Sequence, residues 1–284
     1  MKPGSPEWSR IVTASKVAAI LGLSPWDSPR ATWHLMRGEL DPKPETRPMR
    51  RGNMLENAIL DWWLADNPEW VEVARQPQHS IDDWCAATPD MEVRHVETGE
   101  AMLVDAKTTG DDGDWIDGEP PTYYVASSMW QMAMAPHIER VCLAALFGRP
   151  FDLRSYYVAR DDALIEAVID RCRTFYESLT DDDAAPALTD MPCEYDTVRK
   201  VHAAIDKGET VTLPADLAAE FAAAYHAEKS LPAIKARVLE AMGRAQYGTD
   251  ENGRPIARRQ ASGDAVALYC TAPKPTLDPM ETGS

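Results

Sequence analysis

The most informative segment of the chain is residues 87–107, which read ATPDMEVRHVETGEAMLVDAK. Two short apolar runs within it flank the turn sequence ETG at residues 97–99, and this pattern predicts a β-hairpin. Asp90 precedes one predicted strand, and Asp105 ends the other. Because a hairpin brings these two strand ends together, we expect the two carboxylates to lie side by side.

Asp90 and Asp105 are therefore candidate ligands of a shared cation. Two neighbouring carboxylates repel each other, and a cation between them removes that repulsion. Hard oxygen ligands favour Mg²⁺ or Mn²⁺. Lys107 follows two residues after Asp105 and so points to the same strand face. There its ammonium group can orient or stabilise an attacking hydroxide or a phosphate oxygen.

The alternative for this segment is an exposed strand end that carries solvated charges. A second acidic-x-lysine triplet occurs at residues 41–43 in a proline-rich loop, so the triplet alone is a weak indication. Residues 105–107 differ because an apolar strand precedes them and Pro89-Asp90 lies across the predicted hairpin. The sequence contains no histidine pair with metal-ligand spacing and no glycine-rich phosphate loop.

Periodicity and capping residues predict a mixture of helices and strands along the chain. Loops are expected at residues 39–48, which contain three prolines, and at the acidic segment 111–121. We expect helices at 13–22, 28–38, 53–66, 123–135, 161–179 and 214–245, and strands near 71–73, 78–81, 91–93, 101–105, 140–147 and 152–158, with weaker strands up to residue 270. This order favours an α/β or α+β fold with a mixed sheet.

The domain boundaries follow from proline content and charge. We expect a first domain over residues 1–190, a mostly helical extension over 191–270 and a flexible tail over 271–284. The 284-residue chain has a net charge of −17, yet residues 57–228 hold 12 basic and 34 acidic residues while residues 1–56 hold 9 and 6. Residues 229–259 hold 7 basic and 3 acidic residues, so both ends of the chain are able to contact a polyanion. The alternative is a solvated acidic surface that keeps the protein soluble.

Composition also bears on the compartment. No apolar run approaches the roughly 18 residues of a membrane span, so we expect no membrane association. The first residues lack the apolar core of a secretory signal. The five cysteines are scattered and never form a C-x-x-C pair, which argues against a disulfide framework or a cysteine-ligated metal. These features predict a cytoplasmic protein.

Four segments, in order, resemble the PD-(D/E)xK nucleases, specifically the phage lambda exonuclease and YqaJ-type viral recombinase family. They are IVTASK at 11–16, GNMLEN at 52–57, ATPD at 87–90 and LVDAK at 103–107. The resemblance implies that Asp90, Asp105 and the carbonyl of Ala106 hold Mg²⁺. It further implies that Glu56 completes the metal shell directly or through water, and that Lys107 positions the nucleophilic water.

The same resemblance implies a set of residues that contact the DNA and its terminal 5′-phosphate. Arg50 and Arg51 precede Glu56 on its helix and are candidate phosphate contacts by charge, with a solvated patch as the alternative. The family glutamine of a Y-x-x-Q helix has no counterpart at its usual spacing, so Gln131 or Ser127 is expected to replace it. The candidate DNA-binding residues are Arg10, Ser15, Thr88, Arg50, Arg51 and Gln131.

The resemblance implies a restriction-endonuclease-like core, with a central mixed sheet flanked by helices and a C-terminal helical extension. It implies a Mg²⁺-dependent exonuclease, for which Mn²⁺ is a substitute. This enzyme would degrade linear double-stranded DNA from 5′ ends to mononucleotides and leave 3′ overhangs for recombination. Implied partners are DNA ends, a single-strand annealing protein and further copies in a homotrimer, within a bacterial host if the chain is phage-encoded. Two alternatives remain: another PD-(D/E)xK endonuclease or resolvase, and a non-catalytic DNA-end-binding protein on the same scaffold.

Overall fold

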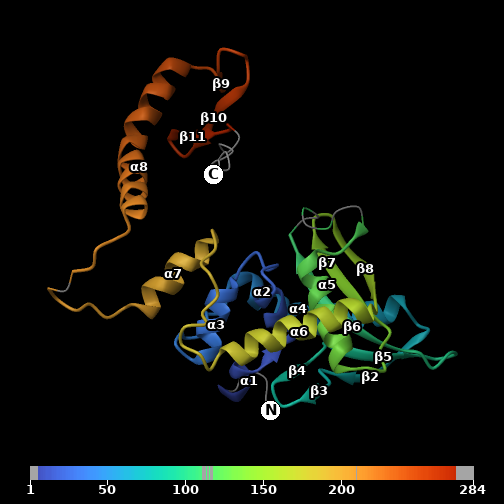
Figure 1. Ribbon diagram of the computed structural model, residues 1–284. Helices are drawn as coiled ribbons and strands as arrows, with labels where there is room; N and C mark the ends of the chain where they lie inside the picture. The colour runs from blue at the N-terminus through green and yellow to red at the C-terminus, as the bar shows by residue number, and fades with distance from the viewer. Residues whose placement is uncertain (1–5, 111–112, 114, 116–117, 209, 273–284) are drawn as a thin grey trace. The chain divides into compact units, whose positions relative to one another are not determined.

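The structure is a computed structural model that describes residues 6–110, 113, 115, 118–208 and 210–272 (Figure 1). The chain divides into two compact units, Met1–Ile205 and Asp206–Ser284. This boundary lies after the expected one at residue 190, because α7 (Pro192–Val201) packs on α3 of the first unit. Part of the expected loop at 111–121 and most of the expected tail at 271–284 lie outside the described residues.

Within the described residues, the first unit contains six further helices and eight strands. The helices are α1 (Pro6–Arg10), α2 (Ala14–Ile20), α3 (Pro29–Arg37), α4 (Arg47–Asp66), α5 (Thr122–Met134) and α6 (Asp162–Ser178). The strands are β1 (Val12–Thr13), β2 (Trp70–Arg75), β3 (His79–Asp82), β4 (Cys85–Ala87), β5 (Met91–His95), β6 (Ala101–Thr109), β7 (Arg140–Gly148) and β8 (Phe151–Ala159).

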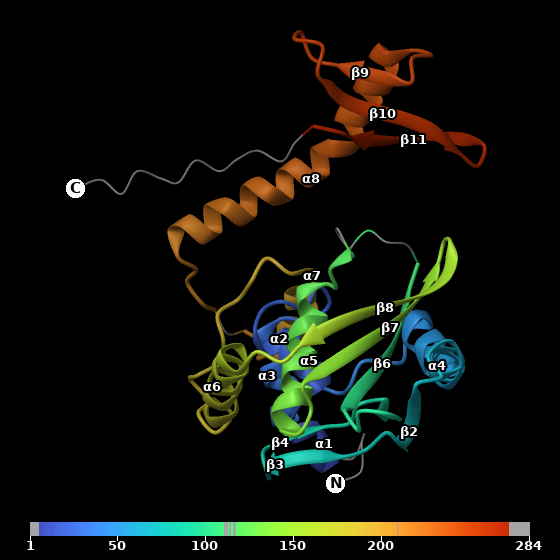
Figure 2. The ribbon, with the colours of Figure 1, turned by 90° about the vertical axis from the view of Figure 1, so that its right-hand side faces the viewer.

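A five-stranded mixed sheet in the order β2-β5-β6-β7-β8 lies at the centre of this unit (Figure 2). The predicted hairpin is confirmed, since β5 and β6 pair antiparallel with Met91 opposite Val104. Strands β6 and β7 are parallel and are connected through α5. At the two edges of the sheet, β2 pairs antiparallel with β5 and β8 pairs antiparallel with β7. The hairpin register places Asp90 and Asp105 at neighbouring positions at one end of the pair.

Helices cover both faces of the sheet, as the expected α/β class requires. On one face α4 buries Ile59, Leu60 and Trp63 against inward residues of β5, β6 and β7. On the other face α5 and α6 pack with α2 and α3 around a larger core that contains Trp33 and Trp130. Figure 2 shows α4 on one side of the sheet and α5 on the other. The sheet is thus a rigid platform for residues at the end of the β5–β6 hairpin.

Helix α4 begins six residues earlier than predicted. The side chain of Thr46 caps it by accepting a hydrogen bond from the backbone N–H of Met49 at 3.4 Å. Pro48 lies in the first turn, where a helix tolerates proline because that N–H has no intrahelical partner. The prediction of a loop over 39–48 is therefore wrong for its last two residues, which belong to α4. Glu56 lies in the middle of this 20-residue helix.

A small three-stranded sheet in the order β1-β4-β3 brings two of the sequence motifs together. Strand β1 pairs parallel with β4, with Val12 opposite Cys85 and Thr13 opposite Ala86. The segments IVTASK and ATPD, more than 70 residues apart, therefore lie beside each other.

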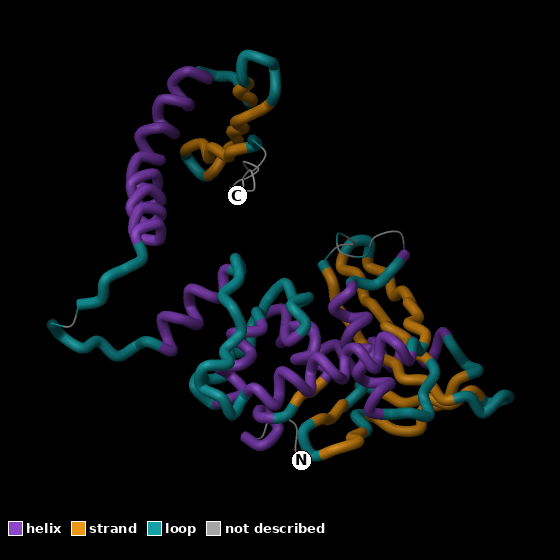
Figure 3. The backbone as a smooth tube through the Cα atoms, viewed as in Figure 1, coloured by secondary structure: helices purple, strands orange, loops and turns teal. Residues whose placement is uncertain are grey.

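The second unit consists of the long helix α8 (Ala215–Met242) and an antiparallel sheet of β9 (Tyr247–Thr249), β10 (Pro255–Ser262) and β11 (Ala265–Cys270) (Figure 3). The predicted helix with Pro232 inside it is confirmed. The extension also contains a β-hairpin, β10–β11, that pairs through six residues of each strand. Within the described ranges, no helix combines the length and apolarity needed to cross a membrane.

Candidate active site

The ends of β5 and β6 hold the two predicted aspartates in mutual contact. The backbone N–H of Asp90 donates to Oδ1 of Asp105 at 3.2 Å, and the backbone N–H of Ala106 donates to Oδ2 of Asp90 at 2.8 Å. Lys107 Nζ lies 2.8 Å from Asp105 Oδ2 and 3.2 Å from the carbonyl oxygen of Ala106. The hairpin therefore brings two carboxylates, one ammonium and one carbonyl into a single cluster.

Gln131 joins this cluster from α5, across the face of the sheet. Its Nε2 donates to Asp105 Oδ2 at 2.9 Å, and its side chain is buried. Ser127, one turn earlier on the helix, donates instead to the carbonyl of Ala14 at 3.2 Å. Of the two candidates for the glutamine position, only Gln131 contacts an aspartate. Its Oε1 is buried and accepts no hydrogen bond within the described part of the chain.

Glu56 faces the same site from α4 and is held by a residue that the sequence analysis did not single out. Gln76 Nε2 donates to Glu56 Oε1 at 3.0 Å, and the backbone N–H of Gln76 donates to the carbonyl of Asp90 at 2.9 Å. Gln76 has φ of +48°, a left-handed conformation that is uncommon for a residue other than glycine. Gln76 therefore connects Glu56 to the strand end that carries Asp90.

A cleft of about 1030 Å³ opens over the cluster. Glu56, Asp90, Ala106 and Lys107 all line it. The remaining lining residues come from the α2–α3 turn, the loop before α4, α4 itself, Thr108 of β6, Tyr124 of α5 and the start of α7. Four of the predicted site residues thus share one accessible space, which is in the size range of small-molecule sites.

Burial and neighbouring charges shift the pKa values of Asp90, Asp105 and Lys107 in different directions. Burial, reinforced by the nearby carboxylate of Asp105, raises the pKa of Asp90 to about 7. Burial opposes ionisation of Asp105 as well, but the ammonium of Lys107 outweighs it and holds the pKa of Asp105 below its ordinary value. The same pairing raises the pKa of Lys107 despite its burial. At neutral pH, Asp105 and Lys107 are an ion pair, and Asp90 is partly protonated.

The donor chemistry of the cluster suits a hard divalent cation. Asp90, Asp105 and the carbonyl of Ala106 offer only oxygen ligands, which Mg²⁺ and Mn²⁺ prefer. Burial and the neighbouring carboxylate of Asp105 both disfavour the charged form of Asp90, and a cation bound between the two aspartates would offset both effects. Among the described residues, no three histidine, cysteine or acidic side chains form a metal-binding group. Two carboxylates and a carbonyl are thus the oxygen groups that a cation could use here, and Glu56, hydrogen-bonded to Gln76, lines the same cleft.

The predicted DNA-contact residues have different surroundings. Thr88 follows β4 directly, and its buried Oγ1 has no hydrogen-bond partner within the described ranges. Ser15 is exposed at the start of α2, with its Oγ 3.1 Å from Thr13 Oγ1. Arg50 and Arg51 are exposed on α4, the helix that carries Glu56, outside the lining of the cleft.

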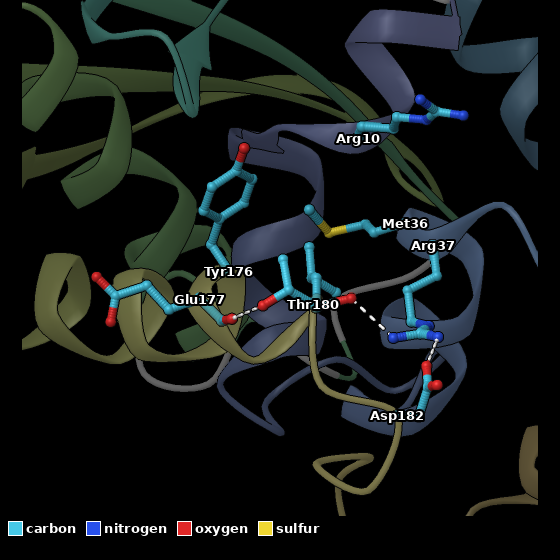
Figure 4. A pocket seen from close by; sticks show the side chains of 8 residues that line it. Arg10, Met36, Arg37, Tyr176, Glu177, Thr180 and Asp182 are labelled. Atoms are coloured by element: carbon cyan, nitrogen blue, oxygen red, sulfur yellow. Dashed lines mark hydrogen bonds and ion pairs between the residues drawn. The ribbon is translucent and has the colours of Figure 1, made fainter.

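Arg10 lies in a different place from the other predicted residues. It lines a second pocket of about 990 Å³ between the end of α1, α3 and the end of α6, together with Met36 and Tyr176 (Figure 4). Arg37 crosses this pocket, where it pairs with Asp182 and donates to the carbonyl of Leu179 at 2.8 Å. Arg10 and the two aspartates do not line a common pocket.

The fold and the site together define an α/β protein whose mixed sheet presents Asp90 and Lys107 to a cleft, with Asp105 buried beside them. Residues 8–137 match the model of the YqaJ-like viral recombinase domain. All of the predicted site residues lie within the matched segment.

Two solved structures similar to the chain are exonucleases by description. The alkaline exonuclease LHK-Exo of Laribacter hongkongensis is 20% identical, with a TM-score of 0.49 over 60% of this chain and 88% of that one. A phage-related exonuclease of Haemophilus somnus 129PT is 11% identical, with a TM-score of 0.47 over 60% and 95%. No curated protein shows significant sequence similarity to the chain.

Proposed function

We propose that the protein is a Mg²⁺-dependent exonuclease that degrades one strand of linear double-stranded DNA from its 5′ end. The products would be mononucleotides and a duplex with a 3′ single-stranded overhang, which is a substrate for recombination. The observation that carries the proposal is the contact of Asp90, Asp105 and Lys107 beside a cleft that Asp90 and Lys107 line, within a segment that matches the YqaJ-like domain.

Each residue of the cluster has a distinct task in phosphodiester hydrolysis. Asp90 and Asp105 would hold the cation with the carbonyl of Ala106. A divalent cation bound there supplies Lewis-acid chemistry, since it neutralises phosphate charge and lowers the pKa of water. Lys107, whose raised pKa keeps it charged, offsets the negative charge that develops on the phosphate and orients the attacking water. Gln131 holds the carboxylate of Asp105 in its orientation.

The cation and Lys107 compete for the same oxygens. The ammonium lies 2.8 Å from Asp105 Oδ2 and 3.2 Å from the Ala106 carbonyl, both of which are proposed ligands. Two positive charges on one carboxylate oxygen repel each other, so the ammonium of Lys107 would weaken the hold of these oxygens on a cation.

The proposal extends to partners. DNA ends are the proposed substrate, a single-strand annealing protein would receive the 3′ overhang, and a homotrimer is the proposed assembly. The protein would act in the cytoplasm of the host cell. Size-exclusion chromatography with light scattering tests the assembly, and a single peak at the mass of one 31.5 kDa chain would contradict it.

The decisive experiment compares linear and circular DNA. Purified protein is incubated with 5′-phosphorylated linear duplex or with closed circular duplex, in Mg²⁺ or in EDTA, and products are resolved by size. Asp105→Asn is the inactive variant. Asp41→Ala is the matched control, since Asp41 begins the only other acidic-x-lysine triplet named above and is exposed.

We expect wild type and Asp41→Ala to release mononucleotides from linear DNA in Mg²⁺ only. Label at the 5′ end should appear in mononucleotides first, and Asp105→Asn should be inactive. Cleavage of the closed circle would instead establish an endonuclease. Loss of label from the 3′ end first would reverse the polarity. Binding to DNA ends without degradation in Mg²⁺ or Mn²⁺ would show that the protein binds DNA ends and is not a nuclease under these conditions.

A further inference from the structure

Trp26 is an exposed tryptophan at the mouth of the cleft. It retains 58% of its accessible surface, whereas Trp33, in the helix that follows, retains 2%. Trp26 lines the same cleft as Asp90 and Lys107. Most tryptophans bury much of their large apolar surface, so a highly exposed one beside a polar site indicates a ligand-binding role.

The turn that carries Trp26 is held in one conformation. Ser24 Oγ accepts hydrogen bonds from the backbone N–H groups of Trp26 at 3.1 Å and of Asp27 at 3.2 Å. Lys43 Nζ donates to the carbonyl of Trp26 at 3.2 Å and also pairs with Asp27. A side chain that is fixed before binding loses little conformational entropy when a ligand arrives.

Aromatic side chains connect Trp26 to the lysine of the cluster. Its ring lies edge-on to Tyr123, with centroids 5.1 Å apart. Tyr123 contacts Tyr124 at 4.5 Å, and Lys107 Nζ lies 5.5 Å from the centroid of the Tyr124 ring. These contacts connect Trp26 to Lys107, so a ligand on Trp26 lies within the same cleft as Asp90 and Lys107.

The cleft also holds an ammonium group beside Trp26. Lys43 lines the cleft and pairs with Asp27, which lines it as well, and the Lys43 side chain is 53% exposed. Thr46 adds a hydroxyl group to the same lining. An aromatic face next to a cationic and a hydroxyl donor matches a nucleotide, which combines a flat base with an anionic phosphate.

We propose that Trp26 stacks on an unpaired nucleobase of the strand that enters the cleft. This inference rests on the proposed nuclease function and adds a substrate-binding residue to it. An unpaired base is required because the bases inside a duplex already stack on both faces, whereas a base separated from its partner presents a free face. Stacking is tolerant of sequence, since every base has a π-face. Trp26 would therefore secure the strand without selecting its sequence.

The test uses a duplex with a short 5′-phosphorylated single-stranded tail, and a second duplex in which abasic sites replace the tail nucleotides. Binding is measured by fluorescence anisotropy in Ca²⁺, so that cleavage does not intervene. The variants are Trp26→Ala, Trp26→Phe and the control Trp62→Ala. Trp62 is 37% exposed on α4, contacts Phe151 and does not line the cleft.

We expect wild type to prefer the normal tail over the abasic tail by roughly 10-fold or more. Trp26→Ala should lose this preference, Trp26→Phe should keep most of it, and Trp62→Ala should keep all of it. In cleavage assays with Mg²⁺, Trp26→Ala should raise KM more than it lowers kcat. Circular dichroism of each variant establishes that it is folded.

Two outcomes would overturn the inference: a wild type that binds both tails equally, or a Trp26→Ala that retains the preference for the normal tail. Failure of the nuclease proposal is distinguishable from failure of this one. If wild type shows the Trp26-dependent preference in Ca²⁺ but cleaves nothing in Mg²⁺ or Mn²⁺, the stacking role of Trp26 stands and the nuclease proposal fails.

Discussion

Gln131 Nε2 and Asp105 Oδ2 are joined by a hydrogen bond of 2.9 Å, on the oxygen that also accepts from Lys107. The contact links α5 to β6 through two buried side chains. Residues that orient a metal-binding carboxylate usually contribute 10- to 100-fold to affinity or activity. The amide of Gln131 thus extends the site beyond the hairpin.

We expect Gln131→Met to lower kcat/KM about 10-fold, because Asp105 loses one of the three donors that orient it while the volume of the side chain is kept. Ser127→Ala is the matched control, since Ser127 lies one turn away and donates to Ala14. Steady-state kinetics on linear DNA, with thermal unfolding as a check of folding, measure the effect. An equal loss in both variants would assign no particular role to Gln131.

Replacement of Asp90 should stabilise the metal-free protein at high pH. The pKa of Asp90 is raised to about 7, so the folded state holds a proton that the unfolded state releases near pH 4. The stability that this group contributes is therefore present below about pH 4 and is lost as the pH rises to 7. Asp90→Asn has no charge to bury and should be more stable than wild type at pH 8, by roughly 1–3 kcal/mol.

Urea unfolding in EDTA at pH 5 and pH 8 tests this expectation. The stabilisation by Asp90→Asn should be larger at pH 8 than at pH 5, and the variant should have no nuclease activity. A stabilisation that does not change with pH would place the pKa of Asp90 near its ordinary value. A destabilisation at both values would assign Asp90 a structural role that its carboxylate charge does not explain.

Lys107→Met should separate metal binding from catalysis. Without the ammonium, Asp105 is a buried carboxylate with no charged partner, so the variant should be less stable in EDTA by about 2–4 kcal/mol. At pH 8.5 it should bind Mn²⁺ several-fold more tightly, because the competing cation is absent, and should be inactive. Isothermal titration calorimetry measures the affinity. Weaker binding by Lys107→Met would show that Lys107 does not compete with the metal.

Gln76→Asn should reduce activity without loss of stability. Asparagine tolerates positive φ, but its side chain is one methylene shorter and does not span the 3.0 Å contact to Glu56. We expect kcat/KM to fall about 5-fold while the melting temperature stays within roughly 2 °C of wild type. Gln78→Asn, an exposed position two residues along the chain, is the control. Unchanged kinetics in Gln76→Asn would mean that Glu56 needs no positioning.

The core of the site could be predicted from the sequence because it depends on local pairing. A hairpin with a short turn has one register, and strand alternation then puts Asp105 and Lys107 on one face. Helix α4 was predicted with its start too late, since proline in a first helical turn resembles a loop in the sequence. Gln76 was missed because its role depends on a left-handed backbone and on Glu56, 20 residues away.

The sequence by itself determined the mixed α/β class, the hairpin and the contact between Asp90 and Asp105, because these follow from the periodicity of neighbouring residues. Only the tertiary structure decided that Gln131 and not Ser127 reaches Asp105, that Arg10 lines a separate pocket, and that Trp26 stays exposed at the cleft. Those placements depend on how α1, α3, α5 and α7 pack against the sheet. Such contacts join residues far apart in the chain, and no local pattern records them.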